Sequence, residues 1–215
     1  MDLAVSDQDR AWAKDKMSNL GITANDLVIG IAPGGAKNPK ECMPLRQWPK
    51  EYFSRLIDKL VRELKAKVIL LGSRDDCFLG TEIIKNAKII GASSSIAGDE
   101  RAPVGAVHNL CGATTLKQLA AIIDNCNVFI GNDSAPMHIA AAVKTPVVSL
   151  FGPTDPKEKA PLNYKHIYLY AGLNCSPCYH DGKYPDCKTQ ECLRKILPED
   201  VLDAIQKILG EGAVK

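Results

Sequence analysis

The sequence lacks any apolar run long enough to cross a membrane. Its apolar segments, such as residues 68–71, fall far short of the roughly 20 residues that a bilayer span requires. It also lacks a basic leader followed by an apolar stretch, so we expect no secretory signal and a cytoplasmic location. We find no internal repeat or low-complexity segment, and the composition excludes a disordered tail, a collagen-like fibre and a simple coiled coil.

A large excess of charge of one sign is also lacking. The 27 Lys and Arg residues against 25 Asp and Glu residues give a formal net charge of +2 at pH 7. Nucleic-acid-binding domains typically carry a strong basic patch, so the composition predicts no nucleic-acid partner. With 46% hydrophobic and 24% charged residues, the 215-residue chain suits one ordinary soluble domain or two small ones.

Cysteine, by contrast, is abundant: the chain has eight. Four are scattered, and the other four cluster at Cys175, Cys178, Cys187 and Cys192. Four thiolates at this density could close a tetrahedral zinc site. The spacing is looser than that of paired C-x2-C motifs, so two disulfides and four free thiols stay open as alternatives. In every case we expect the cluster to be structural, pinning a loop that is too polar to pack by itself.

Strand-like and helix-like segments alternate along the chain. Continuous apolar segments predict strands at 27–31, 67–72, 128–130, 146–151 and 167–170. Apolar residues at helical spacing, together with capping residues, predict helices at 6–21, 49–64, 75–87, 115–123 and 134–143 and from Pro198 onward. Buried strands separated by helices favour a parallel sheet covered on both faces. The sequence therefore predicts an α/β fold with a doubly wound, Rossmann-like parallel sheet.

Ligands of such sheets bind beyond the carboxyl ends of the strands, where three turns of this chain are unusual. The first is Pro33-Gly34-Gly35, directly after a predicted strand. Adjacent glycines let backbone N–H groups approach a phosphate, although a tight turn without a ligand explains them as well. No Gly-Lys-Ser/Thr sequence follows, so the turn is not a P-loop.

The second turn runs from Asn132 to His138, where a strand passes into a helix. Ser134 has the residue type of an N-cap, and a diphosphate at the N–H groups that follow would gain about 0.3–1 kcal/mol from the helix dipole. Asp133 would repel phosphate and is expected to accept sugar hydroxyls or to orient a neighbouring loop. His138 is either a ligand contact or a packing histidine. The third turn offers the hydroxyl of Thr154.

Together these motifs resemble the bacterial heptosyltransferases of glycosyltransferase family 9. The resemblance rests on residues 131–142 (GNDSAPMHIAAA), 145–154 (TPVVSLFGPT), 33–35 (PGG), 46–49 (RQWP) and 109–116 (NLCGATTL). The blocks stand in the family's order, and the similarity covers nearly the whole chain. The cysteine loop is also similar to one that many family members carry.

The resemblance implies a GT-B glycosyltransferase, of which this chain would be the C-terminal half. Residues 1–25 would be a linker helix from an N-terminal domain, and residues 26–215 a nucleotide-sugar-binding domain with the four-Cys loop at 175–192. The N-terminal half would bind the lipopolysaccharide core acceptor and supply the carboxylate that acts as base. Met1 would then mark a truncation, and the isolated chain is expected to be inactive.

The implied activity is inverting, metal-independent transfer from an ADP-heptose-like donor in lipopolysaccharide core biosynthesis. The resemblance implies no cofactor for catalysis, and it places the enzyme in the cytoplasm or at the inner face of the inner membrane. A non-catalytic module for nucleotide-sugar binding or assembly is the alternative.

Family roles carried to matching positions give a donor site. Arg46 stands where the family has a basic residue, usually Lys, that pairs with the diphosphate and stabilises the leaving ADP. A structural Arg beside Trp48 is the competing interpretation. The backbone of Gly34 and Gly35 would approach the phosphates. Asp75 or Asp76 would accept the ribose hydroxyls, although a solvated helix N-terminus explains both carboxylates equally well.

The remaining implied contacts lie at the base and the sugar. Thr114 and Thr115 fall where relatives line the adenine pocket, although helix capping also explains Thr115. The residues expected around the sugar and phosphates are Asn132, Asp133, Ser134, His138 and Thr154. Two features depart from the family: Ala135 replaces a usual Gly, so its methyl would crowd a phosphate, and the loop between Gly35 and Arg46 is long.

Overall fold

The computed structural model of the chain describes residues 3–35, 37–38, 41–88, 106–161, 165–180 and 183–211. Residues 91–105, whose three glycines, three serines and Pro103 predict a loop, lie outside the described residues. Among the described helices, none combines the length and the apolar character that crossing a bilayer takes.

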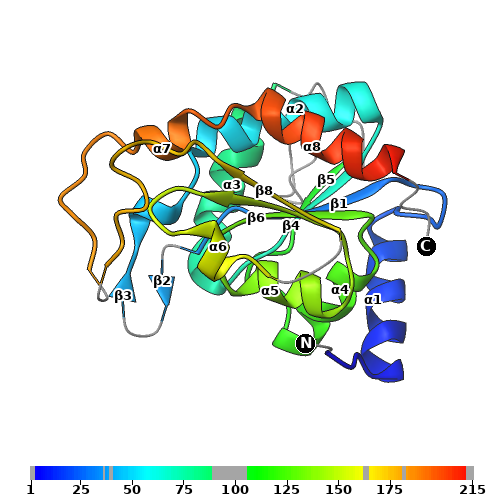
Figure 1. The fold of residues 1–215 in the computed structure, drawn as a ribbon. Coiled ribbons are helices and arrows are strands. Elements are labelled where there is room, and N and C mark those ends of the chain that lie inside the picture. The colour runs from blue at the N-terminus through cyan, green and yellow to red at the C-terminus, as the bar shows by residue number, and fades with distance from the viewer. Residues whose placement is uncertain are drawn as a thin grey trace.

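A parallel sheet of six strands forms the centre of the fold (Figure 1). In sheet order the strands are β5 (Val107–Asn109), β4 (Lys67–Leu70), β1 (Val28–Ala32), β6 (Val128–Asn132), β7 (Val147–Phe151) and β8 (His166–Tyr170). Every neighbouring pair runs parallel. The chain starts at the middle of the sheet, proceeds to one edge, and returns through β6 toward the other edge. This arrangement confirms the predicted doubly wound α/β fold.

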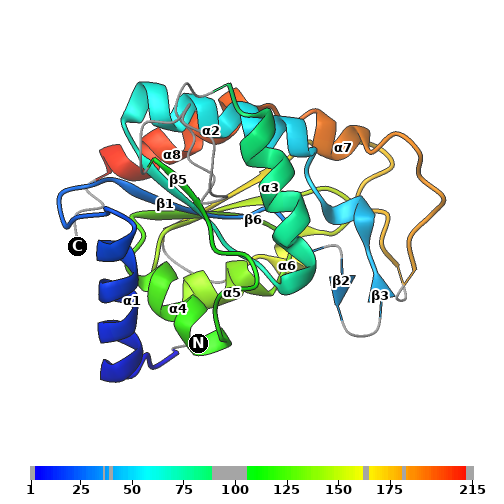
Figure 2. The same cartoon turned by 180° about the vertical axis from the view of Figure 1, so that it is seen from behind.

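Helices cover both faces of the sheet, as the two opposite views show (Figures 1 and 2). One face carries α2 (Lys50–Leu64), α3 (Cys77–Asn86), α7 (Glu191–Arg194) and α8 (Pro198–Gly210). The other carries α1 (Asp7–Asn19), α4 (Leu116–Asp124) and α5 (Ala135–Ala142). Smaller elements are the β2–β3 hairpin (Lys37–Asn38 and Glu41–Cys42), the 3-10 turns η1 (Pro44–Arg46) and η2 (Arg74–Asp76), and α6 (Pro156–Lys159).

The apolar stripe of α2 shows why the layers hold together. Phe53, Leu56, Ile57 and Leu60 recur at helical spacing and are completely buried against the sheet. Burying a side chain of this size contributes about 1.5–3 kcal/mol. β1, β6 and β7 are buried along their whole length, as expected for strands covered on both faces.

Helix α1 belongs to one of these layers. Ser6 caps it, its hydroxyl accepting the Asp9 N–H at 3.1 Å. Ala13 and Met17 are buried in the core that α1 shares with α4, and Arg10 pairs with Asp124 on α4. The predicted division of the chain at residues 25 and 26 stays a prediction.

The outer pair of strands, β7 and β8, holds a partly buried histidine, His166. Ser149 Oγ on β7 lies 2.6 Å from His166 Nε2 on β8. Burial lowers the pKa of His166 below its ordinary value of 6.5, and the charge of His138 lowers it further against the opposing effect of a backbone hydrogen bond with Pro161. Folding therefore favours the neutral imidazole.

We expect the protein to lose stability as the pH falls below 6.5. In the unfolded chain His166 takes up a proton near pH 6.5, whereas in the folded chain it does so only at a lower pH. The free energy of unfolding therefore declines as the pH falls from 6.5 to the pKa of His166 in the folded chain. Thermal unfolding at about pH 7.5 and about pH 5.5 measures the loss. In His166→Gln the same acidification should cost less; an equal cost in both proteins would contradict this role of His166.

Candidate functional site

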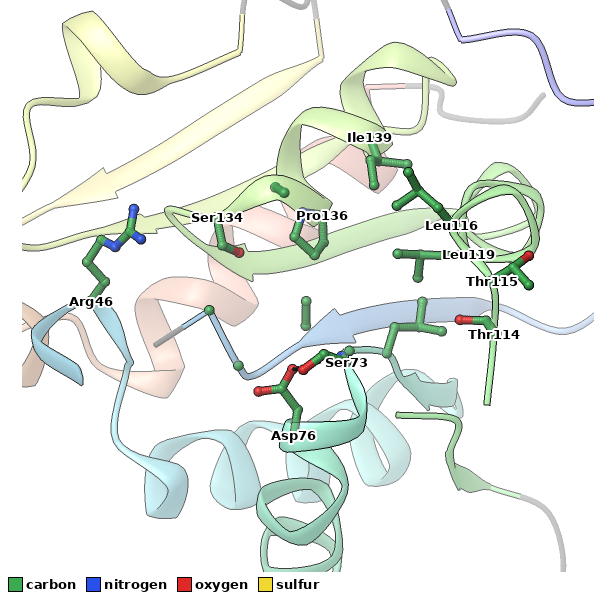
Figure 3. A pocket seen from close by; sticks show the side chains of 16 residues that line it. Arg46, Ser73, Asp76, Thr114, Thr115, Leu116, Leu119, Ser134, Pro136 and Ile139 are labelled. Atoms are coloured by element: carbon green, nitrogen blue, oxygen red, sulfur yellow. Dashed lines mark hydrogen bonds between the residues drawn. The ribbon is translucent and has the colours of Figure 1, made fainter. Parts of the chain in front are cut away.

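A cavity of about 470 Å³ opens at the carboxyl ends of β1 and β6. Numbered along the chain, the strands of the sheet run 3-2-1-4-5-6, and the order reverses between these two strands, where α/β sheets bind their ligands. The walls of the cavity are formed by the turns after β1, β4 and β6 and by the start of α4 (Figure 3). It is lined by Ala32, Gly34, Gly35, Arg46, Leu71, Gly72, Ser73, Asp76, Thr114, Thr115, Leu116, Leu119, Ser134, Ala135, Pro136 and Ile139.

The two glycines after β1 form a turn that is enclosed on both sides. A Cβ on Gly34 would lie 2.1–2.7 Å from the carboxyl group of Asp76. A Cβ on Gly35 would lie 2.7 Å from Ser134 Cβ, and Gly35 has a φ of +98°, which L side chains rarely adopt. The turn therefore requires glycine on steric grounds and presents bare backbone to the cavity.

Arg46 extends into one end of the cavity, across from Ser134 (Figure 3). Its Nη1 lies 3.5 Å from Asp133 Oδ2, at the limit of a hydrogen bond, and the two side chains are only 16% and 8% exposed. Its Nε is buried and has no hydrogen-bond partner among the described residues. A shielded guanidinium with unused donors is suited to bind an anion.

The start of α5 offers an anion fewer donors than the sequence suggests. Pro136 has no N–H, and the Met137 N–H donates to the Ser134 carbonyl at 3.2 Å. The Ser134 hydroxyl donates to the Asn132 carbonyl at 3.3 Å. Ala135 also lines the cavity. Any phosphate here would depend more on Arg46 than on the helix dipole.

Of the two candidate carboxylates after β4, the structure brings Asp76 to the cavity and leaves Asp75 exposed outside it. Asp76 Oδ2 accepts both the backbone N–H of Ser73 at 2.8 Å and the Ser73 hydroxyl at 2.6 Å. These bonds fix the carboxyl group beside Gly34. Asp76 is thus both a helix-capping residue and a polar group of the cavity wall.

The far end of the cavity, away from Arg46, is mostly apolar (Figure 3). Its walls include Leu116, Leu119 and Ile139, which the sequence did not mark as site residues. Thr114 and Thr115 line the same end. Thr115 also caps α4, with its hydroxyl accepting from Gln118 N–H and its own N–H donating to the Gln118 side chain, so the capping interpretation is confirmed. An apolar slot with a polar rim suits a planar base.

Four predicted contacts besides Asp75 do not line the cavity. Asn132 is completely buried, and Asp133 lies beside Arg46. His138 is exposed on α5. Thr154 is 2% exposed, and its hydroxyl has no hydrogen-bond partner within the described part of the chain.

The four clustered cysteines are free thiols. Burial raises the pKa of Cys178 and Cys192, whereas backbone N–H groups of Gln190 and Thr189 lower the pKa of Cys187. Across the described ranges, no group of three or more His, Cys, Asp or Glu side chains is arranged to hold a metal ion. The geometry therefore does not support the zinc alternative over free thiols.

The strand order and the cavity at its reversal point define a Rossmann-like α/β domain. Over residues 1–188 the sequence matches the model of glycosyltransferase family 9 (heptosyltransferase). Lipopolysaccharide heptosyltransferase 3 of Escherichia coli K12 is 33% identical over 214 residues, which cover 99% of this chain and 55% of the relative. Lipooligosaccharide heptosyltransferase 2 of Campylobacter jejuni serotype O:6 is 38% identical over 184 residues, 84% of this chain and 51% of the relative.

Solved structures agree. E. coli ADP-heptose lps heptosyltransferase II is similar with a TM-score of 0.72 at 25% identity, over 99% of this chain and 54% of that one. The structure of the glycosyl transferase family 9 protein from Veillonella parvula is similar with a TM-score of 0.75 at 25% identity, over 99% of this chain and 54% of that one. The chain belongs to glycosyltransferase family 9, as the sequence motifs predict. It spans about half the length of the curated relatives it matches.

Proposed function

We propose that this chain is the donor-binding half of an inverting, metal-independent glycosyltransferase that uses an ADP-heptose-like donor in lipopolysaccharide core synthesis. The observation that carries the proposal is Arg46, whose side chain is only 16% exposed and lines a cavity at the reversal point of the sheet. The family and the half-length match support the same assignment. The GT-B partner half would be an N-terminal acceptor domain.

The cavity suggests how such a donor would lie. The adenine would occupy the apolar slot beside Leu119 and Ile139, and the ribose hydroxyls would donate to Asp76. The diphosphate would then lie between the backbone of Gly35 and the guanidinium of Arg46, which both line the cavity. This order places the sugar beyond Arg46, toward the ends of β6 and β7.

The chemistry follows from that placement. An acceptor hydroxyl attacks the anomeric carbon from the face opposite ADP, the bond between this carbon and the phosphate oxygen breaks, and the configuration inverts. The hydroxyl proton passes to a base of the acceptor half, and ADP leaves with the bonding electrons. Arg46 offsets the charge that develops on the diphosphate, a role that requires no metal ion.

The partners of the whole enzyme follow from the same proposal. Its acceptor would be the lipopolysaccharide core, bound through the N-terminal half. Because that acceptor is a lipid, whereas a nucleotide sugar is soluble, we place the enzyme in the cytoplasm, at the inner face of the inner membrane.

Calorimetric titration with ADP, UDP and GDP, without and then with magnesium, tests the donor site. We expect ADP to bind most tightly and magnesium to leave its affinity unchanged, because Arg46 supplies the counter-charge. An Arg46→Ala chain is the matched control for binding elsewhere. Equal affinity for all three nucleotides, or a strict need for magnesium, would contradict the proposal.

The half-length match also allows a second function, a nucleotide-sugar-binding module without catalysis. Mixing the chain with a separately expressed N-terminal half of a relative, an ADP-heptose donor and a lipid acceptor separates the two. Transfer that appears only in the mixture, and not with the Arg46→Ala chain, supports the enzyme. A stable, soluble complex that never transfers sugar supports the binding module.

A further inference from the structure

Asn132, the last residue of β6, connects the two segments that contribute Arg46 and Gly35 to the lining of the cavity. Its side chain is completely buried, and the hydrogen bonds that its amide makes within the described residues all join backbone groups of two other segments. Oδ1 accepts the Trp48 N–H at 3.1 Å, while Nδ2 donates to the carbonyls of Pro33 at 3.0 Å and Gly34 at 2.8 Å. We propose that Asn132 is a positioning residue that sets the separation between Arg46 and the glycine turn; the inference rests on the proposed donor site.

The bonded groups stand next to the residues that would bind the diphosphate. Trp48 follows Arg46 by two residues, and Gly34 directly precedes Gly35. One planar amide therefore fixes the backbone on both sides of the phosphate position. The next residue, Asp133, lies beside the guanidinium of Arg46, so the end of β6 orients both the backbone and the side chain of that wall.

The bond to Trp48 is not required to bury the indole. Trp48 Nε1 donates to the Ile196 carbonyl at 2.9 Å, and the ring packs edge-to-face on Phe53 with centroids 4.8 Å apart. These contacts hold the segment to the helical layer of α2 and α8. Loss of the Asn132 bonds should therefore leave the indole in place and release the glycine turn relative to Arg46.

An amide suits this position better than any side chain of similar size. It supplies two donors and an acceptor, and the three surrounding backbone groups need this combination. An ionised aspartate would face two carbonyl oxygens with no donor, and an apolar side chain would leave buried backbone groups unpaired. Asn132 therefore need not touch the ligand to affect binding.

The test compares Asn132→Asp with Thr145→Val at about pH 7.5, where a carboxyl group ordinarily ionises. Thr145 is a matched control because it is completely buried and its hydroxyl donates to the Ile123 carbonyl at 2.8 Å, away from the residues that line the cavity. ADP, pyrophosphate and adenosine are titrated into each protein. We expect Asn132→Asp to weaken ADP and pyrophosphate at least tenfold and adenosine less than twofold, and Thr145→Val to leave all three unchanged.

The pattern across the ligands decides the outcome. Unchanged ADP binding in Asn132→Asp, equal losses for adenosine and ADP, or the same losses in Thr145→Val would overturn the positioning role. If the Asp variant does not fold, Asn132→Ser, which puts a hydroxyl in place of the amide, is titrated instead. If the unmodified chain binds no ADP, the proposed function fails, and hydrogen exchange of the Trp48 amide then decides the positioning role of Asn132. Exchange at least tenfold faster in Asn132→Ser than in Thr145→Val upholds this role. Equal exchange in the two variants overturns it.

Discussion

Arg46→Ala should weaken ADP binding about 10- to 100-fold. A hydrogen bond to a charged group is typically worth about 1.5–3 kcal/mol, and each 1.4 kcal/mol changes affinity tenfold. We expect a loss of ADP affinity toward the 100-fold end, because the Arg46 side chain is only 16% exposed and water screens its charge weakly. Calorimetric titration of both proteins with ADP measures the change.

The control for this substitution is Arg55→Ala. Arg55 lies on α2, does not line the cavity, and pairs with Glu199 at 3.5 Å where both side chains are largely exposed. Its loss should leave ADP binding unchanged. Removing Arg46 also leaves Asp133 buried without its cation, so unfolding of each variant is measured to separate a binding defect from a folding defect. Equal ADP affinity in Arg46→Ala and the unmodified chain would remove Arg46 from the site.

The fold was largely predictable because its strands and long helices carry strong periodic patterns. The apolar strands β1, β6 and β7 are buried on both faces, and the stripe of α2 repeats over several turns. The β2–β3 hairpin and α6, each no more than four residues per element, were missed. Segments that short are set by tertiary contacts and show no periodicity.

The site was predictable only in part. The sequence located the turns that meet at the sheet edge, but the direction of each side chain depends on the exact turn. Asp76 reaches the cavity because it folds back onto Ser73, whereas the adjacent Asp75 stays outside it. The apolar slot was missed because residues such as Leu119 and Ile139 look like ordinary core residues in a sequence. Their positions within the first two turns of α4 and α5, beside the ligand edge, were the available signal.

Gly35→Ala should both destabilise the protein and abolish most ADP binding. The residue has a φ of +98°, and the added methyl would lie 2.7 Å from Ser134 Cβ. Backbone strain of this kind costs about 1–3 kcal/mol, and relief of the clash must move the turn away from α5. The displaced backbone can no longer approach a phosphate opposite Arg46, so we expect at least a tenfold loss of ADP affinity, about 1.4 kcal/mol, by calorimetry.

Gly21→Ala separates strain from crowding. Gly21 has a φ of +72°, yet a Cβ there would meet no atom within 4 Å. Its replacement should therefore cost about 1 kcal/mol of stability in thermal unfolding, through strain alone, and leave ADP binding unchanged. The extra instability of Gly35→Ala over Gly21→Ala then measures how tightly Ser134 encloses the turn. If the two variants were equally stable and bound ADP equally well, the turn would accommodate a Cβ at position 35 beside Ser134, and the steric requirement for glycine there would be wrong.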